Sequence, residues 1–121
     1  MKSTPLRQRV TATVADLPEA TAAGDPHLTL AVRKKTFGYF LDDHHGDGIV
    51  GVALKAADGE QEALLHSDPT RFYVPAYLGA KGWIGIRLDV GDVDWAEIRE
   101  LISEAYRLQA PRRLVAQLEG S

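Results

Sequence analysis

The chain has 121 residues, of which 45% are apolar and 26% charged, and it contains no cysteine. This length fits a single domain over residues 1–121, because two separate cores would each bury too little surface. The lack of cysteine excludes disulfides, thiolate nucleophiles and cysteine-ligated metals. No apolar run approaches the roughly 20 residues that span a bilayer, and no signal-peptide pattern follows Lys2. We therefore expect a cytoplasmic protein with no membrane partner.

Charge is distributed unevenly along the chain. The net charge of −3 argues against strong non-specific binding to polyanions. Residues 1–41, however, hold six Lys/Arg and three Asp/Glu, a net of +3, whereas residues 42–121 hold eight and fourteen, a net of −6. A local basic surface is therefore compatible with an acidic protein.

The first half of the chain reads as one helix followed by strands. Ser3 or Thr4 can cap a helix that ends before Pro18, because a residue preceding proline disfavours the helical region. Residues 19–27 are expected to form a loop and residues 42–48 a turn. Alternation with a period of two predicts strands over residues 28–33, 35–41 and 49–55.

The second half of the chain mixes helices and strands. Asp58 with Gln61 predicts the capping box of a short helix that runs to about Leu65, and Asp94 with Glu97 predicts a second capping box. The other expected elements are strands at 71–77 and 83–88, a long helix at 93–108 and a short helix after Pro111. The order α-β-β-β-α-β-β-α-α, with short loops between neighbouring strands, predicts an α+β fold: an antiparallel sheet with helices packed on one face.

Five short segments occur in an order characteristic of a known family. They are Arg33 to Phe37, Ala53 to Lys55, Phe72 to Tyr77, Lys81 to Trp83, and Ala105-Tyr106. On these segments the chain resembles the YjbR/MmcQ-like bacterial family, over about residues 5–110. The resemblance implies a CyaY-like architecture and, through the double-wing interpretation of that fold, DNA binding; it implies no catalytic residues. The chain departs from the family at Ala105, where members often carry serine, and its His44-His45 loop is particular to it.

One face of the predicted sheet carries unusually small side chains. If the aliphatic residues of strands 49–55 and 83–88 face the helices, the opposite face presents Gly51, Ala53 and Gly85. Small residues allow a ligand to approach the backbone closely. Lys55, Arg87 and Trp83 would ring this surface, a combination that suits an anion with a flat ring, such as a nucleotide or single-stranded nucleic acid. A solvated face of an antiparallel sheet would give the same pattern, so both interpretations stay open.

The densest basic run is Arg33, Lys34 and Lys35. These cations could contact phosphates, which position a nucleic acid without reading its sequence. They could equally protect an edge strand against aggregation.

No enzyme or metal motif is present in the sequence. His44, His45 and Asp47 are ligand types, but adjacent histidines on an extended segment diverge and a structural zinc site needs four ligands. The chain contains no GxSxG, HExxH or phosphate-loop pattern. We therefore expect no catalytic residues, no metal and no cofactor.

The sequence predicts a non-enzymatic binding module for DNA or another polyanion. In this hypothesis the cations neutralise phosphates and Trp83 stacks on a ring. The predicted binding residues are Arg33, Lys35, Lys55, Arg71, Lys81, Trp83 and Arg87. The alternative is a protein-interaction domain that docks a partner through the sheet or through the helix after Pro111, and a small enzyme is the third option.

Overall fold

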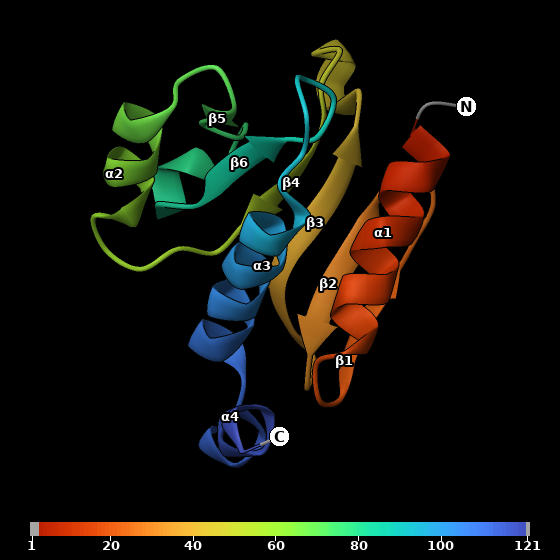
Figure 1. Ribbon diagram of the computed structural model, residues 1–121, viewed down its shortest axis with the longest axis vertical. Coiled ribbons are helices and arrows are strands. Elements are labelled where there is room, and N and C mark those ends of the chain that lie inside the picture. Colours follow the sequence, from red (N-terminus) through yellow and green to blue (C-terminus); the bar gives the residue numbers. More distant parts are fainter. Residues whose placement is uncertain (1–2, 121) are drawn as a thin grey trace.

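The computed structural model describes residues 3–120, which form four α-helices and one six-stranded sheet (Figure 1). The helices are α1 (Ser3–Ala15), α2 (Glu60–Ser67), α3 (Trp95–Gln109) and α4 (Arg112–Glu119). The strands are β1 (Ala20–Ala23), β2 (Leu28–Val32), β3 (Lys35–Asp42), β4 (Val50–Leu54), β5 (Phe72–Tyr73) and β6 (Ile84–Arg87). Two short 3-10 turns, η1 (His44–Gly46) and η2 (Gly79–Lys81), lie between strands.

The sheet is antiparallel throughout, in the order β1-β2-β3-β4-β6-β5. Consecutive strands pair along β1 to β4, and β6 then pairs with β4, while the two-residue β5 forms the edge. The β2–β3 pairing contains a bulge between Leu30 and Ala31, where Phe37 has no partner residue on β2. The bulge allows two consecutive residues to face the core: Phe37 is buried, and Gly38 lies against Leu30 and Leu54.

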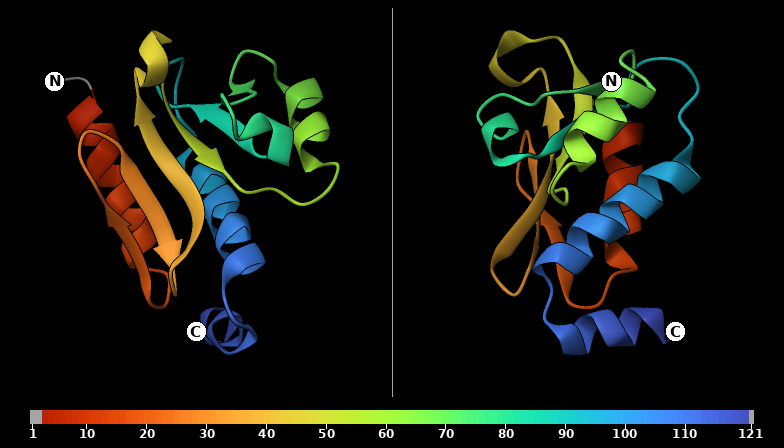
Figure 2. Two further views of the ribbon diagram at one scale, coloured as in Figure 1. Left: turned by 180° about the vertical axis from the view of Figure 1, so that it is seen from behind. Right: turned by 90° about the vertical axis from the view of Figure 1, so that its left-hand side faces the viewer.

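Helices α1 and α3 cover one face of the sheet (Figure 2, right). The core between them and the sheet contains Val10 and Val14 from α1, and Ile98, Ile102 and Tyr106 from α3. The strands contribute their alternate aliphatic residues, which include Val52, Leu54, Ile84, Ile86 and Leu88. The predicted α+β class, the antiparallel sheet and the aliphatic helix-facing side are therefore confirmed.

Two predicted elements differ in extent from the structure. Residues 19–27 are not entirely loop, because Ala20–Ala23 forms β1 and pairs with β2. Three alanines and a threonine carry almost no strand signal, and the segment is extended because it completes the ladder beside β2. The strand predicted at 71–77 is only Phe72–Tyr73, and the chain leaves the sheet before Pro75.

The two predicted capping boxes have different outcomes. At α3 the Asp94 half is confirmed, because its carboxylate accepts hydrogen bonds from the backbone N–H groups of Ala96 and Glu97, whereas the Glu97 carboxylate pairs with Arg71. The box at α2 is wrong: Gly59 is the N-cap, with no side-chain hydrogen bond, and Gln61 instead donates to the carbonyls of Gly79 and Trp83. Gln61 therefore holds η2 and the start of β6 against α2.

Candidate anion-binding site

The small residues of the open sheet face are covered by an aromatic ring of the protein itself. The register aligns Tyr39, Ala53, Gly85 and Tyr73 across four strands. A Cβ placed on Gly85 would lie 2.5 Å from Cζ of Tyr73, and one on Gly51 would lie 3.1 Å from the Tyr73 hydroxyl. The close approach that the small residues permit is therefore that of Tyr73. Burial, with the carboxylates of Asp47 and Asp89, raises the pKa of Tyr73 to about 12.

Trp83 lies on the same open face of the sheet, and we call Tyr39, Tyr73 and Trp83 the aromatic layer. Its side chain is only 6% exposed, and its ring stacks on Tyr39 at a centroid distance of 6.1 Å and an interplanar angle of 30°. The structure therefore does not present Trp83 as an open platform for a ligand ring, because the indole already packs against a neighbouring ring.

Two of the predicted arginines are held by carboxylates. Arg87 donates from Nε to Asp89 at 3.0 Å, and this hydrogen bond raises the pKa of Arg87. Arg71 pairs with Glu97 and, at 2.7 Å, with Asp68. The Thr70 hydroxyl and Arg71 together hold the pKa of Asp68 down to about 2. Both guanidinium groups are neutralised locally, so they stabilise loops rather than offer open positive charge.

The two predicted lysines outside the basic run follow β4 and end η2. Lys55 follows β4, where its backbone N–H donates to the carbonyl of Phe37, and it lines a cleft of about 120 Å³ between α2 and α3. Lys81 is exposed at the end of η2. Of the seven predicted residues, Trp83, Arg71 and Arg87 are therefore engaged by neighbouring side chains rather than open to a ligand.

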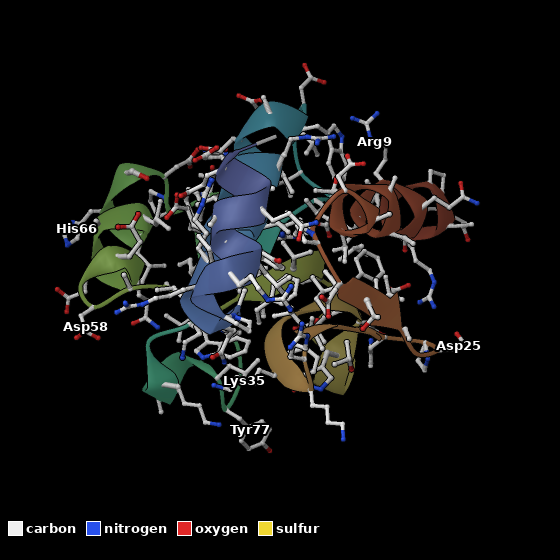
Figure 3. All side chains as sticks on the ribbon, turned by 90° about the horizontal axis from the view of Figure 1, so that it is seen from below. Arg9, Asp25, Lys35, Asp58, His66 and Tyr77 are labelled. Carbon is white, nitrogen blue, oxygen red and sulfur yellow. The ribbon has the colours of Figure 1, made fainter. Side chains whose placement is uncertain are left out.

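The structure does bring together two basic segments that lie far apart in the sequence. The tip of the β2–β3 hairpin carries Arg33 and Lys34, with Lys35 opening β3, and α4 begins with Arg112 and Arg113. Hairpin and helix both lie at the lower end of the molecule in Figure 1, and Figure 3 looks onto this end, with α4 in front and Lys35 beside it. We call these five cations the basic end.

One carboxylate joins the two segments. Glu19, which immediately precedes β1, accepts hydrogen bonds from Nε and Nη2 of Arg33, the latter at 2.9 Å. A guanidinium nitrogen of Arg113 lies 3.9 Å from the same carboxylate. The hydrogen bond from Arg33 lowers the pKa of Glu19, and the same contact raises the pKa of Arg33. Among residues 3–120, no ion pair joins Lys34, Lys35 or Arg112 to a carboxylate.

The backbone at the basic end is conformationally unusual. Five non-glycine residues in the described range have positive φ, and three of them lie here: Glu19 at 58°, Arg33 at 49° and Lys34 at 68°. Val32 pairs with Lys35, so Arg33 and Lys34 form a two-residue hairpin loop with both φ angles positive, which is a type I′ turn. Such turns favour Asn-Gly, because long side chains are disfavoured in the left-handed region.

Core contacts hold the basic end in place. The hydroxyl of Tyr106 donates to the carbonyl of Pro18 at 2.7 Å, next to Glu19. The Gln109 side chain donates to the carbonyl of Thr36 at 3.0 Å and so ties the end of α3 to β3. Leu114 is fully buried and anchors α4. The cations are therefore presented from ordered elements.

Glu19, Arg112 and Arg113 were not among the predicted binding residues. The dibasic pair after Pro111 was a signal that could have found two of them, since it lies at the start of a predicted helix. No pattern in the sequence indicates that Glu19 lies between the two basic segments, because that position depends on the tertiary fold.

Among residues 3–120, apart from the side chain of His45, no three His, Asp or Glu side chains come close enough to hold a metal ion. The rings of His27 and His44 meet edge to face at 5.2 Å; the side chain of His45 lies outside the described residues. Within the same range, no helix is both long and apolar enough to cross a membrane.

Comparison with known proteins identifies relatives by family and by fold. The YjbR family model matches residues 15–108. The crystal structure of protein DR2400 from Deinococcus radiodurans, a DUF419 domain, superposes with a TM-score of 0.69. The two chains are 20% identical, and the similarity covers 91% of this chain and 85% of DR2400, which supports a shared fold. A comparison with curated proteins finds no match. The family match includes Glu19 and the hairpin but ends before α4.

Proposed function

Since the chain belongs to the YjbR family and membership assigns no activity, we propose that it is a non-enzymatic module that binds a polyanion at the basic end. Nucleic acid is the ligand that this surface suits best, because clustered Lys and Arg contact successive phosphates. The proposed site of action is the cytoplasm. The contacts position a phosphate backbone and do not read its sequence.

The observation that carries the proposal is the composition of the hairpin turn. Arg33 and Lys34 occupy two left-handed positions where Asn-Gly would be more stable. Residues held in such conformations are concentrated at functional sites, where the surrounding structure maintains them. A turn that needs only to connect β2 and β3 would be more stable with Asn-Gly than with two long cationic side chains.

The charge of the basic end sets the expected strength of binding. Lys34, Lys35 and Arg112 have no carboxylate partner in the described chain, so about three phosphates can be neutralised without breaking an ion pair. Three contacts predict that affinity for a single strand falls about 20-fold, and for a duplex about 40-fold, between about 50 and about 200 mM salt. The remaining acidic surface, with a net chain charge of −3, limits binding elsewhere on the molecule.

Fluorescence anisotropy with labelled single- and double-stranded DNA at these two salt concentrations tests the proposal. The test variant is Lys34→Gln/Lys35→Gln, which removes two unpaired cations from the basic end. The matched control is Lys81→Gln/Arg99→Gln, which removes two exposed cations from other surfaces: Lys81 on η2, and Arg99, which pairs with Asp16 on the outer side of α3.

We expect the test variant to bind DNA more weakly than the wild-type protein. Its affinity should fall only about threefold between about 50 and about 200 mM salt, because one unpaired cation remains. The control variant should retain the wild-type salt slope. No saturable binding by the wild-type protein at low salt would refute the proposal. Equal losses in the two variants would show that only overall charge matters.

A second candidate function, docking of a protein partner, is supported by the opposite region of the sheet. Tyr39, Leu41 and Tyr77 line a shallow groove of about 300 Å³, in which Tyr77 is 79% exposed. Val74, three residues before Tyr77, is 55% exposed. Exposed apolar residues around a groove are a feature of protein-binding surfaces. Co-purification of a protein that a Val74→Asp variant no longer captures, without any nucleic acid, would favour this function.

A further inference from the structure

Two guanidinium groups from distant segments converge on a single carboxylate at the basic end. Arg33 comes from the β2–β3 hairpin and Arg113 from α4, and both reach Glu19. Arg33 presents the Nε–Nη2 edge of its guanidinium to both carboxylate oxygens. This bidentate hydrogen-bonding geometry suits a phosphate as well as a carboxylate.

We propose that the carboxylate of Glu19 occupies the position of a ligand phosphate, and that an incoming phosphate group displaces it from Arg33 and Arg113. The ligand class is a phosphate group, either in a nucleic-acid backbone or as a free anion. This inference rests on the proposed function, because it concerns the same basic end. It adds a specific phosphate site and a residue, Glu19, that limits its affinity.

The exposure of the pair makes displacement feasible. The side chains of Arg33 and Glu19 are 44% and 47% exposed, and that of Arg113 is 70% exposed. Ion pairs in such positions contribute little to stability, since water screens them and holding two long side chains together costs entropy. The Glu19 side chain can therefore rotate into water while its backbone remains fixed beside Pro18, whose carbonyl accepts the Tyr106 hydrogen bond.

The charges around Glu19 favour a phosphate group over the resident carboxylate. Once the carboxylate has left, Arg33 and Arg113 are both available, and Lys34 and Lys35 follow in the same hairpin. A phosphate offers more acceptor oxygens than a carboxylate, so it can use both guanidinium groups at once. The resident carboxylate keeps the arginines ordered in the absence of ligand and lowers the affinity of each new phosphate.

The decisive variant is Glu19→Gln, which keeps the size of the side chain and removes its negative charge. The matched control is Asp16→Asn. Asp16 is an exposed carboxylate three residues earlier that pairs with Arg99 instead, so the control changes the net charge equally. Both variants and the wild-type protein are titrated with labelled single-stranded DNA, and separately with inorganic phosphate at constant ionic strength.

We expect Glu19→Gln to tighten DNA binding about fivefold to tenfold, because the phosphate no longer has to displace a carboxylate from Arg33 and Arg113. Asp16→Asn should change affinity less than twofold. Inorganic phosphate should shift the Nε–Hε NMR resonance of Arg33, at lower concentrations in Glu19→Gln than in the wild-type protein. A stronger response to DNA than to inorganic phosphate would identify a polymer backbone as the source of the phosphate.

The outcomes separate this inference from the function on which it rests. If the wild-type protein binds DNA but Glu19→Gln binds equally or more weakly, Glu19 is a structural clamp and the inference is overturned while the proposed function stands. If neither protein binds DNA and phosphate leaves Arg33 unshifted, both fail. Should Glu19→Gln unfold, as judged by circular dichroism, the wild-type phosphate titration decides: a shift at Arg33 supports the inference, and no shift overturns it.

Discussion

The hairpin tip allows stability and binding to be changed in opposite directions by one double substitution. Replacing Arg33 with Asn and Lys34 with Gly introduces the residue pair that a type I′ turn prefers. Both positions have positive φ, and a non-glycine residue in the left-handed region costs about 1–2 kcal/mol. The variant should therefore fold more stably although it loses two cations.

The expected gain can be estimated from the structure. Full relief at position 34 and partial relief at position 33, where asparagine still has a Cβ, would give about 1–3 kcal/mol, of which glycine returns part because it increases the entropy of the unfolded chain. The exposed ion pair between Arg33 and Glu19 contributes little to this balance. A net gain of about 1–2 kcal/mol corresponds to a rise in melting temperature of about 4–8 °C for a domain of 121 residues.

Thermal denaturation followed by circular dichroism measures the gain, and anisotropy with labelled DNA measures the loss of binding. Lys35→Asn is the control, because Lys35 lies in β3 and its replacement removes a cation without relieving the turn. The control should weaken binding and leave the melting temperature unraised. A double variant that melts at or below the wild-type temperature would refute the argument from turn strain. A more stable variant with unchanged DNA affinity would show that the hairpin cations do not serve a polyanion.

Three further predictions concern the aromatic layer and the core. Gly85→Ala places a methyl carbon 2.5 Å from Cζ of Tyr73, so we expect a loss of about 1–3 kcal/mol in urea denaturation; an unchanged midpoint would mean that Tyr73 moves freely. Tyr106→Phe removes the donor to Pro18 and should cost about 1 kcal/mol in thermal unfolding, whereas no loss would show that the hydrogen bond is replaceable. Burial raises the pKa of Tyr73 to about 12, so the folded state favours the neutral phenol. The contribution of Tyr73 to the free energy of unfolding is therefore complete below about pH 10 and is lost as the pH rises through 12. Absorbance titration of phenolate should show one tyrosine fewer in the high-pH step of Tyr73→Phe, and an identical curve would contradict the assignment.

Local patterns in the sequence predict most of the fold. Alternation along residues 49–55 and 83–88 correctly separates the helix-facing side chains, such as Val52 and Ile86, from those of the open face. Asp94 identifies the start of α3 because its cap depends only on adjacent backbone groups. The missed strand, Ala20–Ala23, has no such local signal and is extended only because β2 lies beside it.

The candidate site was less predictable because it depends on contacts between distant segments. Periodicity places Gly85 on the open face, but it cannot indicate that Tyr73 of the neighbouring strand covers it. Nor can it show that Glu97, 26 residues away, neutralises Arg71. The β2–β3 hairpin and α4 lie at the same end of the molecule because the chain changes direction after α3, and only the tertiary structure shows this (Figure 1 and Figure 2).

The attachment of α4 determines the fraction of molecules in which the basic end is complete. This eight-residue helix has a single buried residue, Leu114, so its detachment from the domain should require little free energy compared with global unfolding. Each detached molecule lacks Arg112 and Arg113 at the basic end, and the apparent dissociation constant rises in inverse proportion to the fraction of molecules in which α4 remains attached. Amide hydrogen exchange along α4 would then report occupancy: the exchange rates of this helix should fall as ligand is added, while those of the sheet stay unchanged.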